Sequence, residues 1–431
     1  MFISYALSIF KGPIYGFIAY IFIYFNPPFP EYNWWAMYVP TLNWSFITAG
    51  IWVLSAIIHH DQLSSHKFGT VYWVFIFTIL SKIIAETVGV DLLAAREECY
   101  KLFVYCIAII LIIKTLAKKD QLRSIILIVV VMTVFLVITT YTQGKFIHGR
   151  LENVGPSDAF EANELGILLA SILPFTLPYI LKGKKYEKVI CILMIPLILN
   201  VFAFTLSRSA LVSLIGSFLV VALLSRNIKV LKSIIVVAIV GAPLLLYLAD
   251  PSWFERVSSL WKTDTSSEQG VNVLSSGRWE TWIESYRMLQ DYPFGAGPGG
   301  YRALSRFYIS DLTYHPEAEY GVRAAHNSYL LVLVEQGFLG FGIFLIICFS
   351  IISKLLKSAS RIKQLGMAGS FDDLQITGIH ISFFCTLVGG FFNSRLYYEF
   401  FWWQVALAIV AASFAMNMQN TEGDKVDSQR E

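Results

Sequence analysis

The sequence predicts an all-α membrane protein, a polytopic bundle of about 12 transmembrane helices. Hydrophobic residues make up 56% of its 431 positions and charged residues only 15%, whereas soluble domains carry about 25% charged residues. The mean hydropathy is +0.61. Apolar runs of roughly 18 to 22 residues recur, each long enough to cross a bilayer as a helix. The alternation typical of a membrane β-barrel is missing, so helices must satisfy the backbone in lipid.

The predicted spans follow one another along most of the chain, with boundaries uncertain by several residues. The N-terminal run contains Lys11 and lacks a small-residue cleavage site, so we interpret it as a retained span rather than a signal peptide. The spans lie near residues 4–25, 43–60, 68–88, 101–117, 123–141, 162–181, 187–203, 208–224, 229–248, 326–352, 375–393 and 398–417.

Lysine and arginine in the short loops predict the orientation. Alternate loops are basic, whereas residues 26–42 contain neither residue and 89–98 contain only Arg96. We therefore expect the basic loops and both termini to be cytoplasmic and residues 250–325 to form one large periplasmic loop of a bacterial inner-membrane protein. The basic loops hold Lys114, Lys118, Lys119 and Arg123; Lys182, Lys184, Lys185 and Lys188; Arg226, Lys229 and Lys232; and Lys354, Lys357, Arg361 and Lys363.

The large loop is polar but not basic, with seven Arg or Lys and ten Asp or Glu, so it predicts no nucleic-acid partner. An amphipathic helix is expected to follow a cap at Ser276 and to end before Pro293. It would carry Arg278 and Arg287 on its polar face and Trp282 on its apolar face. The helix could lie at the membrane interface or pack on the bundle.

Some patterns argue against other classes of site. The five cysteines, Cys99, Cys106, Cys191, Cys348 and Cys385, fit neither a disulfide framework nor a zinc site. The glycines at 295–300 follow no strand, which predicts a tight turn rather than a dinucleotide fold. Lys82 and Glu86, four apart, could pair within the bundle. Residues 418–431 predict a disordered cytoplasmic tail.

An active site on the outer face must use a donor that is already activated and already across the membrane. A lipid-linked diphosphate meets this need, since its sugar–phosphate bond releases a good leaving group once the charge is neutralised. Arginine binds phosphate bidentately and stays charged, and histidine can activate an acceptor hydroxyl near neutral pH.

Arg208, Arg278 and His326 are the candidate catalytic residues. Arg208 begins a span at its outer end, where a charge is costly unless it is functional or snorkels to the interface. Arg278 opens the amphipathic helix, and a surface salt bridge is the alternative. His326 lies where the loop enters the next span, and capping or packing is the alternative.

Candidate substrate-binding residues surround these three. Asn163, near the outer end of a span, could hydrogen-bond a sugar or cap a helix. Asn327 follows His326, and Arg287 accompanies Arg278. No histidine–carboxylate cluster has metal-ligand spacing, so we expect a metal-free reaction without a cofactor. Further outer residues, each more typical of a solvated side chain, are His148, Arg150, Arg302, Arg306, His315, Arg323 and Arg395.

At these residues the chain resembles the O-antigen ligase and polymerase superfamily over roughly residues 160–345. The motifs are short, and their order and spacing carry the resemblance. They are Ser207-Arg208-Ser209-Ala210, Gly277-Arg278-Trp279 with Trp282, Asp291-Tyr292-Pro293-Phe294-Gly295-Ala296-Gly297, His326-Asn327-Ser328-Tyr329-Leu330 and Glu335-Gln336-Gly337-Phe338-Leu339-Gly340.

The resemblance implies a glycosyltransferase of the GT-C type that moves glycan from undecaprenyl diphosphate, with inversion, to an acceptor on the periplasmic face. Ligases use lipid A–core as the acceptor, polymerases a second lipid-linked glycan, and a related branch uses protein hydroxyls. It also implies that Arg208 and Arg278 bind the diphosphate and that His326 activates the acceptor. We expect a ligase acting as a monomer, with a polymerase as the alternative.

A transporter of lipid-linked glycan is the alternative from another class, although no matching halves of the sequence are evident. The expected organisation has N-terminal transmembrane helices in residues 1–160 and an O-antigen ligase-like region in 161–345, which includes the loop. C-terminal transmembrane helices follow in 346–417, and then the tail.

Overall fold

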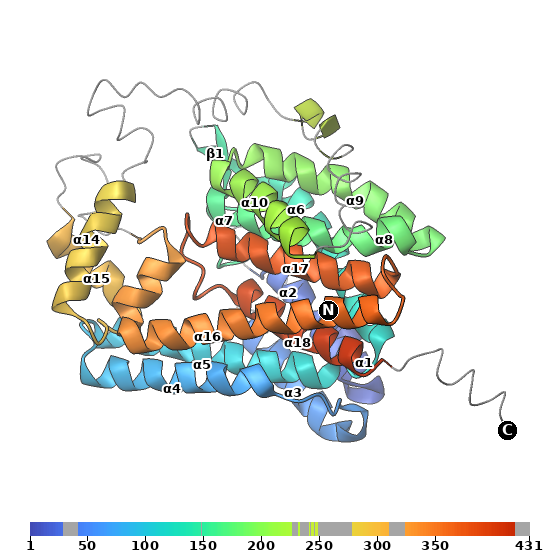
Figure 1. Ribbon diagram of the computed structural model, residues 1–431, viewed down its shortest axis with the longest axis horizontal. Helices are drawn as coiled ribbons and strands as arrows, with labels where there is room; N and C mark the ends of the chain where they lie inside the picture. Colours follow the sequence, from blue (N-terminus) through green and yellow to red (C-terminus); the bar gives the residue numbers. More distant parts are fainter. Residues whose placement is uncertain are drawn as a thin grey trace.

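The computed structural model describes residues 1–28, 42–147, 149–225, 278–309 and 324–418, together with isolated positions between 232 and 248. These residues form an almost entirely helical bundle (Figure 1), which confirms the predicted all-α membrane class. The sheet that they contain is a hairpin in which β1 (Lys145–Ile147) pairs antiparallel with β2 (Arg150–Glu152).

The helices before this hairpin match most predicted spans, with two corrections. The single span expected at 4–25 is wrong, because Gly12 has a φ of 135° and Pro13 starts a second helix. The loop expected at 89–98 is largely helical, since Asp91 Oδ1 accepts the Ala94 N–H at 3.1 Å and caps the start. These elements are α1 (Phe2–Lys11), α2 (Pro13–Phe25), α3 (Trp44–Ile58), η2 (His60–Gln62), α4 (Gly69–Thr87), α5 (Leu92–Thr115) and α6 (Lys119–Gln143).

Two prolines shape the next part of the bundle. The span expected at 162–181 forms, but Pro174 and Pro178 divide it, and the turn between its two α-helical parts is a 3-10 helix. The elements after the hairpin are α7 (Ala162–Ile172), η3 (Leu173–Thr176), α8 (Leu177–Lys182), α9 (Lys185–Phe204) and α10 (Arg208–Ser225).

The amphipathic helix predicted in the loop is α14 (Arg278–Asp291), which ends before Pro293 as expected. It packs against α16 through its buried face, which includes Met288 and Leu289, while Ile283 and Tyr286 are exposed, so both predicted alternatives remain open. The remaining helices are α15 (Gly300–Tyr308), α16 (Ser328–Gln364), α17 (Phe371–Gly389) and α18 (Glu399–Met416).

The glycine-rich segment forms the predicted tight turn and docks on a kink in α16. The N–H groups of Ala296 and Gly297 donate to the carbonyls of Val334 at 2.8 Å and Glu335 at 3.0 Å. Gly337, at the kink, has a φ of 64°, and a Cβ there would lie 2.5 Å from the Phe294 carbonyl carbon. Two motifs that are distant in sequence therefore meet through backbone contacts.

Five of the described helices are long and apolar enough to cross a membrane, and α1, α2, α3 and α10 are shorter apolar helices. The span expected at 229–248 lies largely outside the described residues. So do the loop segments 249–277 and 310–323, with Ser276, His315 and Arg323, as well as His148 and the tail from 419. The five helices are Lys119–Gln143, Ala162–Lys182, Lys185–Phe204, Ser328–Gln364 and Glu399–Met416.

The two ends of the bundle collect different predicted loops. At one end, the basic end, Lys119 pairs with Asp372 at 3.3 Å and Arg123 Nε donates to Glu187 Oε1 at 2.7 Å. The other end, the hairpin end, holds the β-hairpin, the starts of α7, α10, α16 and α18, and the connection 390–398. Figure 1 shows β1, α14 and α15 toward one end of the long helices and the C-terminus of α18 toward the other.

The cysteines and the predicted Lys82–Glu86 pair can be placed as well. All five cysteines are buried free thiols. Glu86 accepts hydrogen bonds from both Lys82 and Arg96, and the Lys82 side chain is 52% exposed, so the pair forms at a helix surface rather than in the core.

Candidate functional site

Asn163 joins the hairpin to the start of α10. Its Oδ1 accepts from Arg150 Nη2 at 2.8 Å and from Ser207 Oγ at 3.0 Å. It does not cap α7, because Glu161 occupies the cap position and exchanges capping contacts with Glu164. The cap alternative is therefore wrong, and Asn163 instead fixes the residue that precedes Arg208.

Arg208 is the first residue of α10 and its side chain is half-buried. Ser207 Oγ also accepts the Ala210 N–H at 3.2 Å, which satisfies part of the helix start. Arg150 Nε donates to the Thr205 carbonyl at 3.2 Å and so holds the same turn. The predicted solvated role of Arg150 is wrong, because its side chain supports the segment that presents Arg208.

His326 and Asn327 form the start of α16. Asn327 Oδ1 accepts the N–H groups of Tyr329 at 2.9 Å and Leu330 at 3.1 Å, so this oxygen is used in capping. A substrate contact by Asn327 stays a prediction and would fall to its amide nitrogen. His326, half-buried, stands just before the cap rather than in it.

Backbone strain marks the same end. The described non-glycine residues with positive φ are Asn153 (59°), Leu206 (48°) and His326 (45°). Such a conformation costs about 1–3 kcal/mol per residue and often occurs where function requires a particular geometry. Leu206 lies two residues before Arg208, so strained backbone accompanies two of the predicted catalytic positions.

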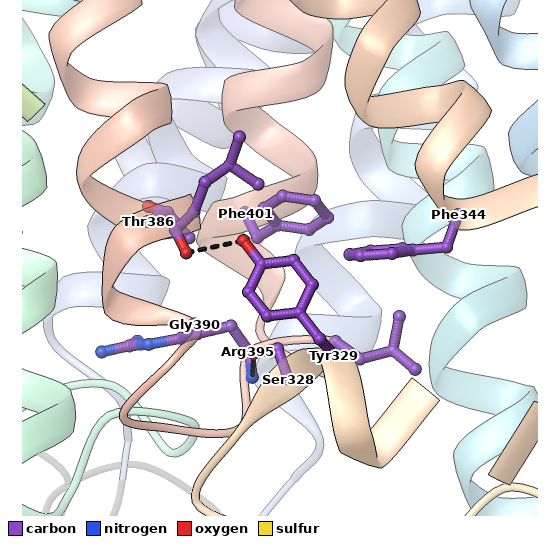
Figure 2. A pocket seen from close by; sticks show the side chains of 9 residues that line it. Ser328, Tyr329, Phe344, Thr386, Gly390, Arg395 and Phe401 are labelled. Atoms are coloured by element: carbon purple, nitrogen blue, oxygen red, sulfur yellow. Dashed lines mark hydrogen bonds between the residues drawn. The ribbon is translucent and has the colours of Figure 1, made fainter. Parts of the chain in front are cut away.

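Arg395 connects these two halves. Its backbone N–H donates to Ser328 Oγ at 2.7 Å, and its Nη2 donates to the Glu164 carbonyl at 2.8 Å. Ser328 in turn donates from its N–H to Gly390 at 2.6 Å and from its hydroxyl to Asn393 at 2.8 Å. The connection 390–398 therefore joins the His326 segment to the turn of α7 that carries Asn163. Figure 2 shows Ser328, Arg395 and Gly390 around one point.

Sequence reasoning missed the role of Arg395, for which a solvated side chain was predicted. It is only 6% exposed, packs over the Tyr398 ring at 4.5 Å, and lies near Asp158 and Glu164. Burial lowers the pKa of Arg395, and the two carboxylates oppose that shift. Burial likewise raises the pKa of Asp158, against hydrogen bonds from the Glu399 N–H and the Tyr24 hydroxyl. Local sequence gave no signal for this packing.

The structure places the other predicted arginines less directly. Arg278 begins α14, one turn before Thr281, whose carbonyl accepts the Tyr301 hydroxyl at 3.2 Å. The Arg278 side chain is outside the described residues. Arg287 is 64% exposed and pairs with Glu284 at 3.0 Å, so its described contact is on α14 itself. Its substrate-binding role stays a prediction.

Two hollows of very different size lie at this end. A void of about 10 Å³ beside Ser328, Tyr329 and Arg395 has room for about one water (Figure 2). There the Tyr329 hydroxyl donates to the Leu387 carbonyl at 2.7 Å. A cavity of about 450 Å³ lies between the end of α2 and the starts of α3 and α18.

Some of the predicted site residues therefore come together at the hairpin end. Asn163, the start of α10, the start of α16 and Arg395 belong to one connected set of hydrogen bonds at the hairpin end. Residues 191–345, which include Arg208, Arg278 and His326, match the family model described as O-antigen ligase. This part of the chain is therefore similar to O-antigen ligases. This match confirms the resemblance to the O-antigen ligase superfamily. No curated protein matches the chain.

The residues matched by the family model do not include the whole site. Asn163 precedes the matched residues and Arg395 follows them. Because both form hydrogen bonds within the connected set, the site draws on segments before and after the matched residues. Among the described residues, no group of three or more His, Cys, Asp and Glu side chains is arranged to hold a metal ion.

Proposed function

We propose that this protein is a glycosyltransferase that moves glycan from undecaprenyl diphosphate to an acceptor hydroxyl at the hairpin end. The observation that carries the proposal is the hydrogen-bonded link between the segments of Arg208 and His326 through Asn163, Arg395 and Ser328. That link supports a single site in which an arginine can bind the donor diphosphate and a histidine can accept the acceptor's proton. The match of residues 191–345 to the O-antigen ligase family model supports the reaction class.

In the proposed reaction the donor diphosphate binds Arg208 and Arg278. Guanidinium groups neutralise the leaving diphosphate bidentately, and the N-terminus of α10 adds its positive helix dipole beside Arg208. The C–O bond between the anomeric carbon and the diphosphate breaks, and the diphosphate leaves with the electron pair.

His326 acts on the acceptor. Its imidazole takes the proton of the acceptor hydroxyl while the hydroxyl oxygen attacks the anomeric carbon from the face opposite the diphosphate. The attack inverts the configuration. This in-line geometry needs the base and the arginines on opposite sides of the sugar. Their location on different helix starts, α16 and α10, suits that need. No metal takes part in this scheme.

The acceptor and the membrane topology are proposed from the resemblance to the ligases. We propose lipid A–core as the acceptor, an inner-membrane location with about 12 spans and a GT-C architecture, and a periplasmic site in a monomer. A polymerase would instead use a second lipid-linked glycan. The described basic loops meet at the basic end, where Lys119 pairs with Asp372 and Arg123 with Glu187, and this supports the orientation.

A transfer assay tests the proposal. Purified protein is given undecaprenyl-diphosphate glycan with lipid A–core or with a second lipid-linked glycan, and the elongated product is identified. A ligase glycosylates lipid A–core, whereas a polymerase lengthens the lipid-linked glycan. Movement of intact donor across proteoliposomes without any transfer to either acceptor would support the transporter instead and refute the proposed activity.

A further inference from the structure

The cavity of about 450 Å³ is separate from the hydrogen-bonded set around Asn163 and His326. It is far larger than the voids of about 10 Å³ beside Tyr329 and beside Lys119, and its size falls in the range of small-molecule sites. Aromatic and polar side chains share its lining. They include Tyr20, Tyr24, Trp44, Asn43, Ser157 and Glu399.

The lining excludes two ligands that a protein of this kind could hold there. A diphosphate needs cations, yet the described lining contains no Lys or Arg and does contain the carboxyl group of Glu399. An acyl chain would bury that carboxyl group and the Asn43 amide against hydrocarbon, which is costly. A neutral polyhydroxylated ligand avoids both penalties.

The walls suit the two surfaces of a sugar ring. The C–H faces of a pyranose are apolar and pack on flat aromatic rings, which Tyr20, Tyr24 and Trp44 provide. Sugar hydroxyls can donate to the Glu399 carboxylate and accept from the Asn43 side-chain amide, whose oxygen caps α3 by accepting the Phe46 N–H at 3.0 Å. Aromatic platforms combined with a few fixed polar groups are therefore well matched to carbohydrate.

The polar wall is held in place before any ligand arrives. Trp403 Nε1 donates to Glu399 Oε1 at 3.0 Å, and the Tyr20 hydroxyl also hydrogen-bonds Glu399. The Tyr24 ring lies 4.8 Å from that of Trp403. Side chains fixed in this way lose little freedom on binding, which favours affinity.

The cavity also lies close to the candidate site along the chain. Arg395 and Glu399 are four residues apart, so their Cα atoms are separated by at most about 14 Å. Between them, Tyr398 donates to Glu164, next to Asn163. A glycan whose reacting end lies near His326 would therefore reach the cavity with sugars a short distance from that end.

We propose that this cavity binds neutral sugar residues of the glycan, away from the bond that is broken or formed. The inference rests on the proposed transferase function for its biological meaning, but the binding itself can be measured without transfer. The bound sugars belong either to the donor or to the acceptor glycan, and the chemistry of the cavity is the same for both.

A plug variant tests the binding directly. Ser157 lines the cavity and is exposed, so Ser157→Trp adds bulk there, and Ser157→Ala is the matched control that leaves the space open. The probe is the free oligosaccharide released by mild acid from the lipid-linked glycan of the source cells. Its binding to full-length protein in detergent is followed by saturation-transfer NMR.

We expect the wild type and Ser157→Ala to bind the oligosaccharide and Ser157→Trp to lose at least about tenfold in affinity, one decade in the dissociation constant. Equal binding by the plug and control variants, or no binding by the wild type, overturns the sugar site. If Ser157→Trp fails to fold, Ser45→Trp with Ser45→Ala plugs the same cavity from the start of α3.

Transfer kinetics then identify the source of the sugars. Donors that carry one sugar and donors that carry many are compared. If the cavity binds sugars of the donor, Ser157→Trp should raise the donor KM about tenfold for the long donor only. With acceptors of two lengths, an acceptor site predicts the same for the long acceptor. A wild type that binds oligosaccharide but transfers nothing refutes the proposed function and leaves the cavity assignment standing.

Discussion

At the basic end, Arg123 forms a two-pronged pair with Glu187 and stacks over Phe371 at 3.9 Å. At the hairpin end, the buried Arg395 donates to a backbone carbonyl instead, and its Nε has no hydrogen-bond partner among the described residues. Asp158 Oδ1 and Asn393 Nδ2, which are buried nearby, also lack partners there.

The two ends also differ in backbone strain, which lowers the stability of the folded protein. Positive φ values at Asn153, Leu206 and His326 cost free energy, and these are all of the described non-glycine residues with a positive φ. Unpartnered buried polar atoms occur at both ends, since Gln375 Nε2, beside Lys119 and Asp372, also lacks a hydrogen-bond partner among the described residues. The basic end pairs its charges and holds the loops together. Such polarity between ends fits a protein that reserves one end for substrates, and variants at the two ends should behave differently.

His326→Ala has the largest expected effect on transfer. Loss of the proposed base should lower the rate of glycan transfer by about 10²- to 10⁴-fold, with the thermal stability little changed. The rate is measured with purified protein and both lipid substrates. His60→Ala, an exposed histidine in η2 on the predicted cytoplasmic side, is the matched control and should keep full activity.

Arg208→Ala should come next. Removing the guanidinium that we propose binds the leaving diphosphate should lower transfer by about 10²-fold, and Arg208→Lys should restore part of it because a single charge remains without the bidentate geometry. Steady-state kinetics over donor concentration measure both. Arg306→Ala, on the exposed surface of α15, is the control. Equal rates for Arg208→Ala and this control would remove Arg208 from the site.

Arg395→Lys should have a smaller effect through position alone. Lysine keeps the charge but not the planar group over Tyr398, so we expect about a tenfold fall in kcat with the donor KM unchanged. A merely structural role would reduce the amount of folded protein and leave kcat per folded molecule at the wild-type value. Active-site titration with a slow substrate separates these outcomes.

Arg123→Ala should reverse the pattern. The substitution leaves the Glu187 carboxylate, whose side chain is 3% exposed, without its ion-pair partner. It should therefore lower the free energy of unfolding by about 2 kcal/mol. The transfer rate per folded molecule should stay within about twofold of the wild type. Thermal unfolding in detergent and the transfer assay are run on the same sample. A large loss of specific activity would end the division of roles between the two ends.

Much of this fold could be predicted because long apolar runs determine helices in a membrane. The spans expected at 43–60 and 398–417 correspond closely to Trp44–Ile58 and Glu399–Met416. The break at Gly12 was missed, although a glycine followed by proline is a recognisable helix boundary. The start of α5, around Arg96, is predicted as a loop because hydropathy does not detect a helix that begins before its apolar run.

The site was less predictable from sequence. Arg208 and His326 stood out as polar residues at the starts of apolar spans, and the resemblance supplied their roles. Arg395 did not, because the partner of a loop arginine depends on which helices approach the loop. The structure shows that its contact is with Glu164, 231 positions away. Asn163 is predicted to contact a sugar, but its side-chain oxygen accepts hydrogen bonds from Arg150 and Ser207.

Binding of the donor tests the division of labour most directly. Equilibrium binding of undecaprenyl-diphosphate glycan is measured for the wild type, for His326→Ala and for the double variant Arg208→Ala/Arg278→Ala. We expect His326→Ala to bind donor like the wild type but to transfer glycan about 10²- to 10⁴-fold more slowly, and the double variant to lose binding. Wild-type donor affinity in the double variant, or normal transfer by His326→Ala, would contradict this expectation.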